Sequence, residues 1–453
     1  MNIIIAGCGK IGSFLAEKLA ADKHDVTVID KNEANLNAVG NSLDVMTCTG
    51  DAANAEVMEE AGASDTDLLL AVTDSDEINL LVCLIGRKMG CKAAIARVRN
   101  HCYDSSQELI RKDLGIDRYI NPDRATASEI LRSLKYKSVG QVETFGGGRV
   151  ELLTLQVKPG MPICNVQIKD LAKILSTKIF ICAIKRDDFV FIPNGLTEIK
   201  AGDTISFGTN QRDTIRFFNE MKMDVGAITA LTIIGASRLG EELALQAAEH
   251  GIAITFIDKD PENCRYIANR IPVADVILGD ATDTDLLDEY GILKSQAVVT
   301  CTDEETINAV ISMYVRKNAP ECKVITKIKK SDFSDLVSNL DMGSIYNVKN
   351  ITADIILKRV KAINNSNSDE IVSLTHIIDN KVMVLEFKIT KDHPNRDIPL
   401  RSLNFKENLL AAAIIREGKN FMPGGNDVIK AEDTLLVVTT NEDIGAFKDI
   451  FEQ

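Results

Sequence analysis

The feature that most constrains the fold of this chain is an internal duplication. Val26–Lys31 (VTVIDK) returns in the second half as Ile254–Lys259 (ITFIDK). Gly50–Ala52 (GDA) returns as Gly279–Ala281, so the register between the two copies drifts by a single inserted residue. Because self-similarity at a fixed period is typical of repeated structural units, the two halves are expected to share one architecture.

The duplication includes the end of each half as well as its beginning. Ile192–Ile205 parallels Met422–Leu435 in nearly the same register. Runs of Gly, Asn and Ser at Gly146–Gly148 and Asn364–Ser368 are expected to be hinges between the two parts of each half, and Met223–Thr229 is expected to join the halves. The repeat predicts four domains, at residues 1–138, 139–224, 225–367 and 368–453.

In the first part of each half, short apolar runs alternate with stretches of helical periodicity. A helix is expected at Lys10–Ala21, and Pro122 stands where another helix begins, a favoured position for proline. Alternating strands and helices predict an α/β fold with a doubly wound parallel sheet of the Rossmann type, which the second half repeats from Ala230. The expected strands of the first copy are Asn2–Ala6, Val26–Asp30, Asp44–Cys48, Asp67–Thr73, Ala93–Val98 and Arg118–Ile120.

The second part of each half has a different pattern. Helices are expected at Ile168–Leu175 and Arg212–Met221, between strand-like runs. This pattern predicts a small α+β domain after each Rossmann-type domain, and it contains no catalytic constellation. The expected strands are Val150–Val157, Phe180–Lys185, Phe189–Ile192 and Thr204–Phe207.

Composition argues against several classes of function. The 453 residues carry a formal net charge of -14, which fits poorly with binding to nucleic acid or to anionic lipid. The apolar runs are shorter than the about 20 residues of a membrane span, and no signal peptide precedes the first strand, so a cytosolic location is expected. Ten cysteines form no Cys-x-x-Cys pair and the histidines show no ligand spacing, so no metal site is expected.

A Gly-x-Gly-x-x-Gly motif follows the first expected strand and opens the first expected helix, a context that predicts a dinucleotide-binding loop. Gly7 permits the tight turn, Gly9 lets the backbone approach a pyrophosphate, and Gly12 lets the helix pack on the strand. The N-terminus of the helix directs N–H groups and a positive dipole toward phosphates. The candidate binding residues of this loop are Gly7, Gly9, Lys10, Ile11 and Gly12.

Asp30 ends the second expected strand, at the distance along the chain from the glycine loop that this motif requires of its acidic residue. A carboxylate there accepts hydrogen bonds from ribose hydroxyls and repels a 2′-phosphate. It therefore favours NAD(H), or another adenine nucleotide with a free ribose such as ATP or ADP, over NADP. Lys31, Asp51 and Ala52 lie near the same edge of the sheet and are further candidates. Two roles remain open for Asp51, which either flanks the adenine or caps the next helix.

More candidates follow the fourth and fifth expected strands, where a doubly wound sheet opens its ligand crevice. Thr73 is a candidate for contact with ribose or phosphate, or for a helix cap, and Asp74 follows it. Asn79 is expected to reach the crevice from the next helix. Arg97 is expected either to meet phosphate oxygens or to form a salt bridge.

The second copy of the loop departs from the glycine pattern at one position. Ser237 stands where the first copy has Gly9, and a side chain there narrows the approach to the backbone. The second copy is therefore expected to bind a nucleotide more weakly, to bind a different one such as ATP or ADP, or to have lost binding. Its candidate residues are Gly235, Ser237, Arg238, Leu239, Gly240, Asp258, Lys259, Asp280, Ala281, Thr302 and Asn308.

With these motifs, the chain resembles the TrkA family of potassium uptake regulators over nearly its whole length. The resemblance implies two RCK units (regulator of potassium conductance), each a nucleotide-binding Rossmann domain with a small α+β domain. It further implies a cytoplasmic homo-oligomeric ring beneath a transmembrane Trk-type potassium transporter, at the inner face of the cell membrane. The motifs that carry it are Gly7–Gly12 with Asp30, Gly50–Ala52, Thr73–Asp74 with Asn79, and Arg97–Asn100.

An NAD-dependent oxidoreductase is the alternative function. Hydride transfer needs an acid or base held near the nicotinamide, and His101, just beyond the fifth expected strand, is the candidate histidine. Its counterpart in the second half is Ser331, and the small α+β domains bring no catalytic residues. The sequence therefore favours a regulatory binding protein over an enzyme.

Overall fold

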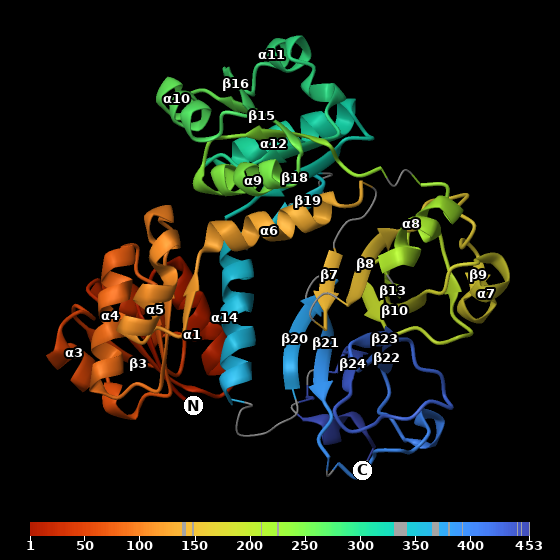
Figure 1. Cartoon of the computed structure of the whole chain (residues 1–453), viewed down its shortest axis with the longest axis horizontal. Helices are drawn as coiled ribbons and strands as arrows, with labels where there is room; N and C mark the ends of the chain where they lie inside the picture. Colours follow the sequence, from red (N-terminus) through yellow and green to blue (C-terminus); the bar gives the residue numbers. More distant parts are fainter. Residues whose placement is uncertain are drawn as a thin grey trace.

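The chain folds into four lobes, two built on parallel sheets and two on antiparallel sheets (Figure 1). This architecture confirms the predicted fold class. No helix among the described residues is long and apolar enough to cross a membrane. The computed structural model describes residues 1–137, 142–146, 149–209, 211–223, 226–329, 342–364, 371–378, 381–391, 393–441, 443–444 and 446–452.

The first parallel sheet has the strand order β3-β2-β1-β4-β5-β6, which is the doubly wound order of dinucleotide-binding domains. Ile5 of β1 pairs with Val28 on one side and with Leu70 on the other, so the sheet reverses its winding between β1 and β4. Its strands are β1 (Asn2–Ala6), β2 (Asp25–Asp30), β3 (Met46–Thr49), β4 (Leu68–Ala71), β5 (Ala93–Arg97) and β6 (Arg118–Ile120). Its helices are α1 (Lys10–Ala21), α2 (Glu33–Gly40), α3 (Ala55–Glu60), α4 (Asp76–Met89), α5 (Gln107–Leu114) and α6 (Pro122–Leu134).

The second parallel sheet repeats this order as β16-β15-β14-β17-β18-β19. Ile233 of β14 pairs with Phe256 and with Val299, at the positions that correspond to Ile5 and its neighbours. Its strands are β14 (Ala230–Ile234), β15 (Ala253–Asp258), β16 (Ala274–Leu278), β17 (Ala297–Thr300), β18 (Lys323–Lys327) and β19 (Ser344–Tyr346). Its helices are α9 (Arg238–Glu249), α10 (Pro261–Arg270), α11 (Thr284–Glu289), α12 (Glu305–Asn318) and α14 (Val348–Asn364).

The two Rossmann-type lobes exchange their last helices. In Figure 1, α6 from the first half lies against α9 of the second lobe, and α14 from the second half lies beside α1 of the first. The apolar residues of α6 recur every three or four positions, as on one face of a helix, and join the core of the second sheet. They are Ala127, Ile130 and Leu134. Their counterparts in α14, which join the core of the first sheet, are Ala353, Ile356 and Val360.

Polar contacts also hold α6 against the second half. The Asn121 side chain caps the N-terminus of α6 and donates a hydrogen bond of 3.0 Å to Oε1 of buried Glu242. At the other end, the ammonium group of Lys323 donates to the backbone oxygens of Ser133 and Tyr136. Burial lowers the pKa of Lys323 to about 7. Both ends of the crossing helix are therefore attached to the opposite lobe.

The two antiparallel sheets pack against each other across a shared apolar core. This core contains Leu152 and Cys182 from the first sheet and Val384 and Ala413 from the second. The first sheet contains β7 (Val142–Phe145), β8 (Val150–Gln156), β10 (Phe180–Arg186), β11 (Phe189–Phe191) and β13 (Thr204–Thr209). The second contains β20 (Ile371–Ile377), β21 (Val382–Lys388), β22 (Leu409–Arg416), β23 (Lys419–Phe421) and β24 (Thr434–Thr439).

Smaller elements complete the first α+β lobe. A short strand pair lies beside the sheet, and the helices lie close to the predicted positions. These elements are β9 (Val166–Gln167), β12 (Glu198–Ile199), α7 (Leu171–Ile174) and α8 (Gln211–Glu220).

One predicted hinge is wrong. Gly146 follows β7, which the sequence did not predict, and lies in the connection between β7 and β8, inside the α+β lobe. Its backbone N–H donates a hydrogen bond of 2.8 Å to Oε1 of Glu386 in the opposite sheet. A Cβ atom at Gly146 would lie 2.0 Å from Cδ1 of Ile415, so this turn is tightly packed. Residues 147–148, most of the predicted hinge at 364–368, and residues 224–225 of the join lie outside the described residues.

The helix exchange makes a testable prediction. Replacing Ile130 of α6 by alanine removes buried methylene groups from the core of the second sheet, at a cost of about 2–5 kcal/mol. We therefore expect faster backbone hydrogen exchange in α9 and β14, although the substitution lies in the first half of the sequence. The matched variant Ile356→Ala in α14 should accelerate exchange in α1 and β1. Hydrogen-exchange mass spectrometry that found each effect confined to the substituted half would contradict the exchange.

Candidate nucleotide site

A cavity of about 1060 Å³ opens at the carboxyl ends of β1, β2, β4 and β5. Its volume is at the upper end of the range of about 300–1,000 Å³ for ligand pockets. The predicted site residues of the first half that line it are Gly7, Gly9, Lys10, Ile11, Asp30, Lys31, Asp51, Ala52, Thr73, Asp74 and Arg97. Gly12 and Asn79 are not among the lining residues.

The three glycines of the loop have different surroundings. Gly7 has a φ of 104°, and a Cβ atom there would lie 2.9 Å from the backbone nitrogen of Thr73. A Cβ atom at Gly12 would lie 1.8 Å from the carbonyl oxygen of Gly7, so any side chain would open the loop. A Cβ atom at Gly9, which precedes α1, would have no neighbour within 4 Å. Gly7 and Gly12 therefore allow close packing, whereas the space at Gly9 is open to a ligand.

Asp30 connects the loop to the second strand. Its Oδ2 accepts a hydrogen bond of 2.5 Å from the backbone N–H of Cys8, and its Oδ1 accepts one of 2.7 Å from Asn32. A carboxylate oxygen has two acceptor lone pairs, so each oxygen still has capacity for a hydroxyl donor. This arrangement fits the predicted contact with ribose.

Asp51 lines the cavity and does not cap a helix. Its Oδ1 accepts from the backbone N–H of Ala53, whereas α3 is capped by Asn54. Lys31 forms an ion pair of 2.9 Å with Asp51 at the rim of the cavity, and this hydrogen bond lowers the pKa of the Asp51 carboxyl group. The helix-cap alternative for Asp51 is therefore wrong. Asp280, its counterpart in the second half, bonds to Thr282 in the same way.

The prediction that Asn79 reaches the crevice is also wrong. Asn79 is completely buried, and its Oδ1 accepts from the N–H and the hydroxyl of Thr73, at 2.8 and 2.7 Å. Its Nδ2 donates to the carbonyl oxygens of Thr73 and Arg97. Asn308 makes the same four bonds with Thr302 and Lys327 in the second half. These asparagines clamp neighbouring strand ends and so shape the crevice from behind.

Two arginines at the end of β5 give the cavity a positive wall. The Nε atoms of Arg97 and Arg99 are buried, and neither has a hydrogen-bond partner among the described residues. Burial, together with the neighbouring charge of Arg99, lowers the pKa of Arg97 to about 10. Both arginines line the cavity, so their guanidinium groups supply positive charge to its wall. Arg97 therefore fits the predicted phosphate contact, and Arg99 is a further candidate for such a contact.

The cavity continues into the second half of the chain. Ser237, Arg238 and Leu239 of the second glycine loop line it, and so does Lys327, the counterpart of Arg97. The sequence did not predict this joint site, because neither copy alone indicates that the two crevices face each other. The other second-half residues that line the cavity are Asp303, Ile328, Lys329, Asn347, Val348 and Lys349.

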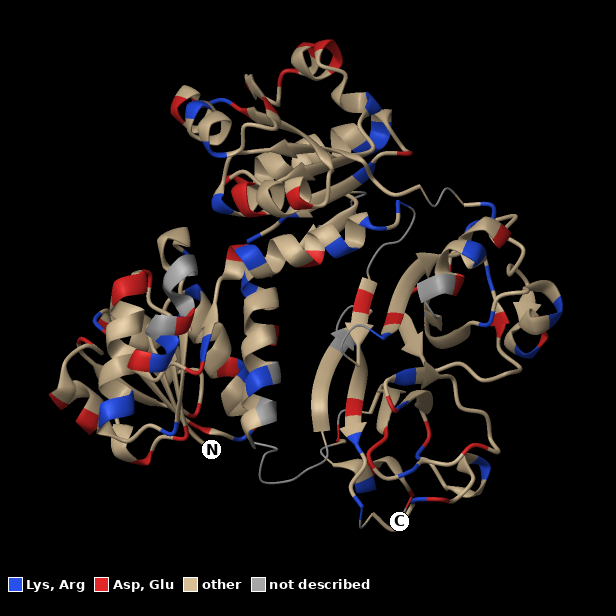
Figure 2. Ribbon diagram, viewed as in Figure 1, with Lys and Arg blue, Asp and Glu red and all other residues tan. Residues whose placement is uncertain are grey.

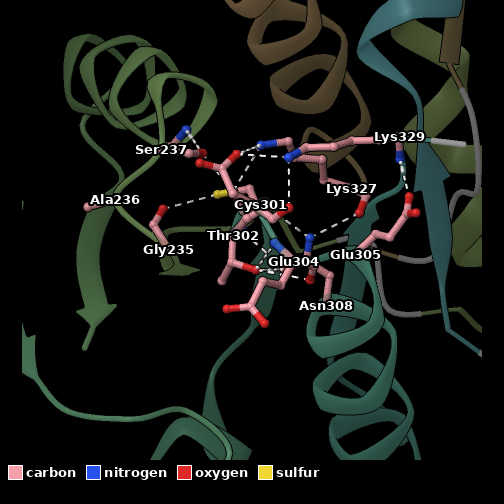
Figure 3. Close-up of polar contacts among 12 residues, drawn as sticks. Gly235, Ala236, Ser237, Cys301, Thr302, Glu304, Glu305, Asn308, Lys327 and Lys329 are labelled. Atoms are coloured by element: carbon pink, nitrogen blue, oxygen red, sulfur yellow. Dashed lines mark hydrogen bonds and ion pairs between the residues drawn. The ribbon is translucent and has the colours of Figure 1, made fainter. Parts of the chain in front are cut away.

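In the second glycine loop, the side chain of Ser237 stands where Gly9 leaves space in the first. The Ser237 hydroxyl donates a hydrogen bond of 2.6 Å to the carbonyl oxygen of Cys301, and the Lys327 ammonium group donates one of 3.2 Å to the same oxygen (Figure 3). Ser237 also caps α9. In the first loop, Gly9 leaves the corresponding space open. The two copies therefore differ where a pyrophosphate would approach the backbone.

The remaining candidates of the second copy lie outside this cavity. Asp258 repeats the bonding of Asp30, because it accepts from the N–H groups of Ala236 and Asp260. Lys259, the counterpart of Lys31, forms an ion pair of 3.1 Å with Glu304, whereas Lys31 pairs with the counterpart of Asp280. The predicted residues that do not line the cavity are Gly235, Gly240, Asp258, Lys259, Asp280, Ala281, Thr302 and Asn308.

Charge on the rest of the surface is mixed. Figure 2 shows basic and acidic residues interspersed over all four lobes, so no lobe presents a uniformly basic face in this view. Nucleic-acid binding proteins typically cluster lysine and arginine on one face. The lysine and arginine side chains that line the cavity from both halves are therefore a local cluster, not part of a larger basic surface.

Comparisons with known proteins agree with this architecture. The TrkA-N domain model matches residues 3–122 and 231–348, which contain the two parallel sheets. The TrkA-C domain model matches residues 152–222 and 384–452, in the two antiparallel lobes. A Trk system potassium uptake protein TrkA homolog from Archaeoglobus fulgidus is 31% identical over 100% of both chains. TrkA from Azorhizobium caulinodans is 23% identical over 100% of this chain and 98% of that protein.

Solved structures share the same fold. The GsuK channel bound to NAD has a TM-score of 0.62 and 17% identity, and the match covers 97% of this chain and 77% of that one. The GsuK RCK domain has a TM-score of 0.61 and 16% identity, with coverage of 97% and 92%.

The asparagine clamp makes a prediction about stability. Asn79→Ala removes the four hydrogen bonds of a fully buried side chain at the ends of β4 and β5, and we expect it to lower the free energy of unfolding by about 3 kcal/mol. The exposed Asn41 offers a matched control, for which alanine should cost less than about 0.5 kcal/mol. Urea unfolding measures both variants. Equal midpoints for Asn79→Ala and Asn41→Ala would contradict the structural role of Asn79.

Proposed function

Given that this chain belongs to the TrkA family, with two TrkA-N and two TrkA-C domains, we propose that it is the nucleotide-binding regulatory subunit of a Trk-type potassium uptake system. The observation that carries the proposal is the cavity in which the first glycine loop and cations from both halves meet. A ligand in this cavity contacts both halves of the chain. Its binding therefore favours one arrangement of the lobes over another.

The proposed ligand is NAD(H), with ADP or ATP as alternatives. The open space at Gly9 would admit the pyrophosphate, Asp30 would accept from the ribose, and Asp51 with Ala52 would flank the adenine. Arg97 and Arg99, which line the cavity, would bind the phosphate oxygens through their guanidinium groups. The fold relative GsuK has been solved both bound to NAD and bound to ADP, which supports this choice of ligands.

We propose one nucleotide per chain, held by the first half. In the second half, Ser237 and Lys327 already bind the carbonyl oxygen of Cys301 where the loop would otherwise approach a pyrophosphate. The second half would instead direct Arg238 of this loop toward the phosphates of the nucleotide in the first half. The second copy would thus contribute charge to the shared site without a ligand of its own.

A regulatory role fits the site better than catalysis. The alternative of an oxidoreductase requires an acid or base beside the nicotinamide. His101, the candidate for that role, is not among the cavity-lining residues, and its Nε2 lies 3.3 Å from Oε1 of buried Glu242 at the junction of the halves. The position of His101 therefore supports a structural role in the contact between the halves.

We further propose that the chain forms a homo-oligomeric ring. Apolar side chains are exposed at matching positions of α4 and α12, where Leu81 is 42% exposed and its repeat counterpart Val310 is 48% exposed. Ile85 and Tyr314 are half-buried one turn further along the same helices. Exposed apolar patches favour protein–protein contact. Two such surfaces on each chain meet the requirement of a closed ring for repeated contacts.

The proposed partner is a transmembrane Trk-type potassium transporter subunit. Relatives that match the whole chain are named as Trk system potassium uptake proteins. The ring would lie in the cytoplasm, peripheral to the inner face of the membrane, and would be attached through this partner. A nucleotide would change the gate to the extent that it binds the two ring states with different affinity.

The asymmetry of the two loops predicts the effect of exchanging their residues. Gly9→Ser would copy the side chain of Ser237 into the first loop, and we expect it to weaken NAD or ADP binding at least tenfold, because a hydroxyl would occupy the open space. Isothermal titration calorimetry should give one site in the native chain. Ser237→Gly is the matched control and should keep the affinity of that site within about threefold. Unchanged affinity in Gly9→Ser would contradict the assignment.

The transport role predicts a growth phenotype. Cells that lack this chain should take up potassium more slowly at low external potassium, and the native gene should restore uptake. The Gly9→Ser variant should be expressed at the normal level and yet respond weakly to the nucleotide state of the cell. Potassium uptake measured with rubidium tracer distinguishes these outcomes. Normal uptake in the absence of the chain would count against the proposed function.

A further inference from the structure

Two lysines of the second half meet at one carboxylate in the shared cavity. Lys327 is the last residue of β18 and Lys329 follows it two positions later, and both line the cavity together with Asp303. The Oδ1 atom of Asp303 lies 3.0 Å from the ammonium nitrogen of Lys329 and 3.6 Å from that of Lys327. One carboxylate oxygen therefore pairs with two of the cations that the second half contributes to the cavity.

The other aspartates that line the cavity have different partners. Asp30 accepts hydrogen bonds from backbone N–H groups, and Asp51 pairs with a lysine of its own half. Asp123 lines the cavity as well, but it forms no ion pair among the described residues. The carboxylate that pairs with the lysines of the second half is therefore that of Asp303.

The first half has the same strand end without this carboxylate contact. Asp74 and Arg99 are the counterparts of Asp303 and Lys329. In both copies the backbone oxygen of the aspartate accepts a hydrogen bond from the basic side chain, at 2.9 Å in the first half and 2.7 Å in the second. Among the described residues, the carboxylate of Asp74 forms no ion pair. The two copies therefore differ in what the aspartate side chain does.

A ligand can exchange places with the carboxylate of Asp303. The Asp303 side chain is 83% exposed, so little packing fixes it, and ion pairs of exposed groups stabilise a protein only slightly. Lys327 is buried and also donates to the carbonyl oxygen of Cys301, so it stays beside the cavity when the carboxylate leaves. An ammonium group binds carboxylate and phosphate oxygens alike. A phosphate oxygen can therefore take the position of Oδ1 between the two lysines.

We propose that Asp303 forms an autoinhibitory contact, in which its carboxylate holds Lys327 and Lys329 until a phosphate group of the ligand displaces it. The displacement costs affinity, because the ligand must break two ion pairs to form its own. It also transmits binding to the second half, because the lysines then bind the ligand instead of their own strand end. This inference rests on the proposed function and adds regulation to its site.

A purely structural role for these ion pairs gives a different expectation. If they only fastened Lys329 to the neighbouring strand end, Asp303→Asn would lower the stability and would not raise the affinity for a nucleotide. Glu304 offers a matched control, because it is the next residue and forms an ion pair of 3.1 Å with Lys259. Neither Glu304 nor Lys259 lines the cavity. Glu304→Gln therefore removes the same charge from the same loop without releasing a cavity lysine.

The test titrates the full-length native chain, Asp303→Asn and Glu304→Gln with NAD and with ADP by calorimetry. For the ligand that binds the native chain more tightly, we expect Asp303→Asn to raise the affinity about fivefold, because the carboxylate no longer competes with the phosphate. Glu304→Gln should keep the affinity within about twofold.

A double-mutant cycle then shows whether the competition acts through the lysines. Lys329→Met removes the nearer partner of the Asp303 carboxylate. In the Lys329→Met background, Asp303→Asn should raise the affinity by less than about twofold. An equal gain in both backgrounds would overturn the inference, because the carboxylate would then repel the ligand directly.

Other outcomes separate this inference from the proposed function. If the native chain binds a nucleotide and Asp303→Asn binds it equally well or more weakly, the inference is wrong and the nucleotide site stands. If neither the native chain nor the variant binds NAD or ADP, the proposed nucleotide function is wrong and the inference fails with it.

Discussion

The exchange of α6 and α14 is the interaction on which the rest of this structure depends. Each helix carries an apolar face that completes the core of the opposite sheet, through Ile130 in one direction and Ile356 in the other. Neither parallel sheet can bury its full apolar surface without the other half of the chain. The two halves are therefore obligate neighbours, and their crevices open into one cavity.

A shared cavity allows the two copies of the repeat to diverge. The first loop keeps open space at Gly9, while the second replaces that glycine with Ser237 and satisfies the carbonyl oxygen of Cys301 internally. In an isolated Rossmann domain, such a change would simply weaken a binding site. In this chain, the second loop still lines the cavity of the other copy and brings Arg238 to it, while Lys327 at the end of β18 lines it as well. Under the proposed function, the loop that has lost its own ligand would thus contribute to the site of the other copy.

The sequence predicted the positions of helices and strands better than it predicted which of these elements pack against one another. Apolar periodicity located β1, β6 and α1 at the residues where the structure has them, and the glycine spacing indicated the open loop. Periodicity does not specify the surface that covers an apolar face, so the exchange of α6 and the joint cavity could not be predicted. Asn79 shows a second limit, because an amide at its spacing from Thr73 suits a ligand contact and a clamp on the strand ends equally well. The same clamp around Asn308, in the copy whose loop carries Ser237, favours the structural role.

The size of the preference that one ligand can give to one state links the single cavity per chain to assembly into a ring. Moving a two-state equilibrium from 1:99 to 99:1 requires a preference of about 10⁴-fold for one state. A single ligand that bridges two halves through a few phosphate contacts reaches a coupling of roughly 5- to 150-fold. Two or more chains that change state together multiply their preferences, so a ring converts a modest preference at each cavity into an almost complete switch. The bridging geometry of the cavity and the proposed oligomer are in this sense parts of one mechanism.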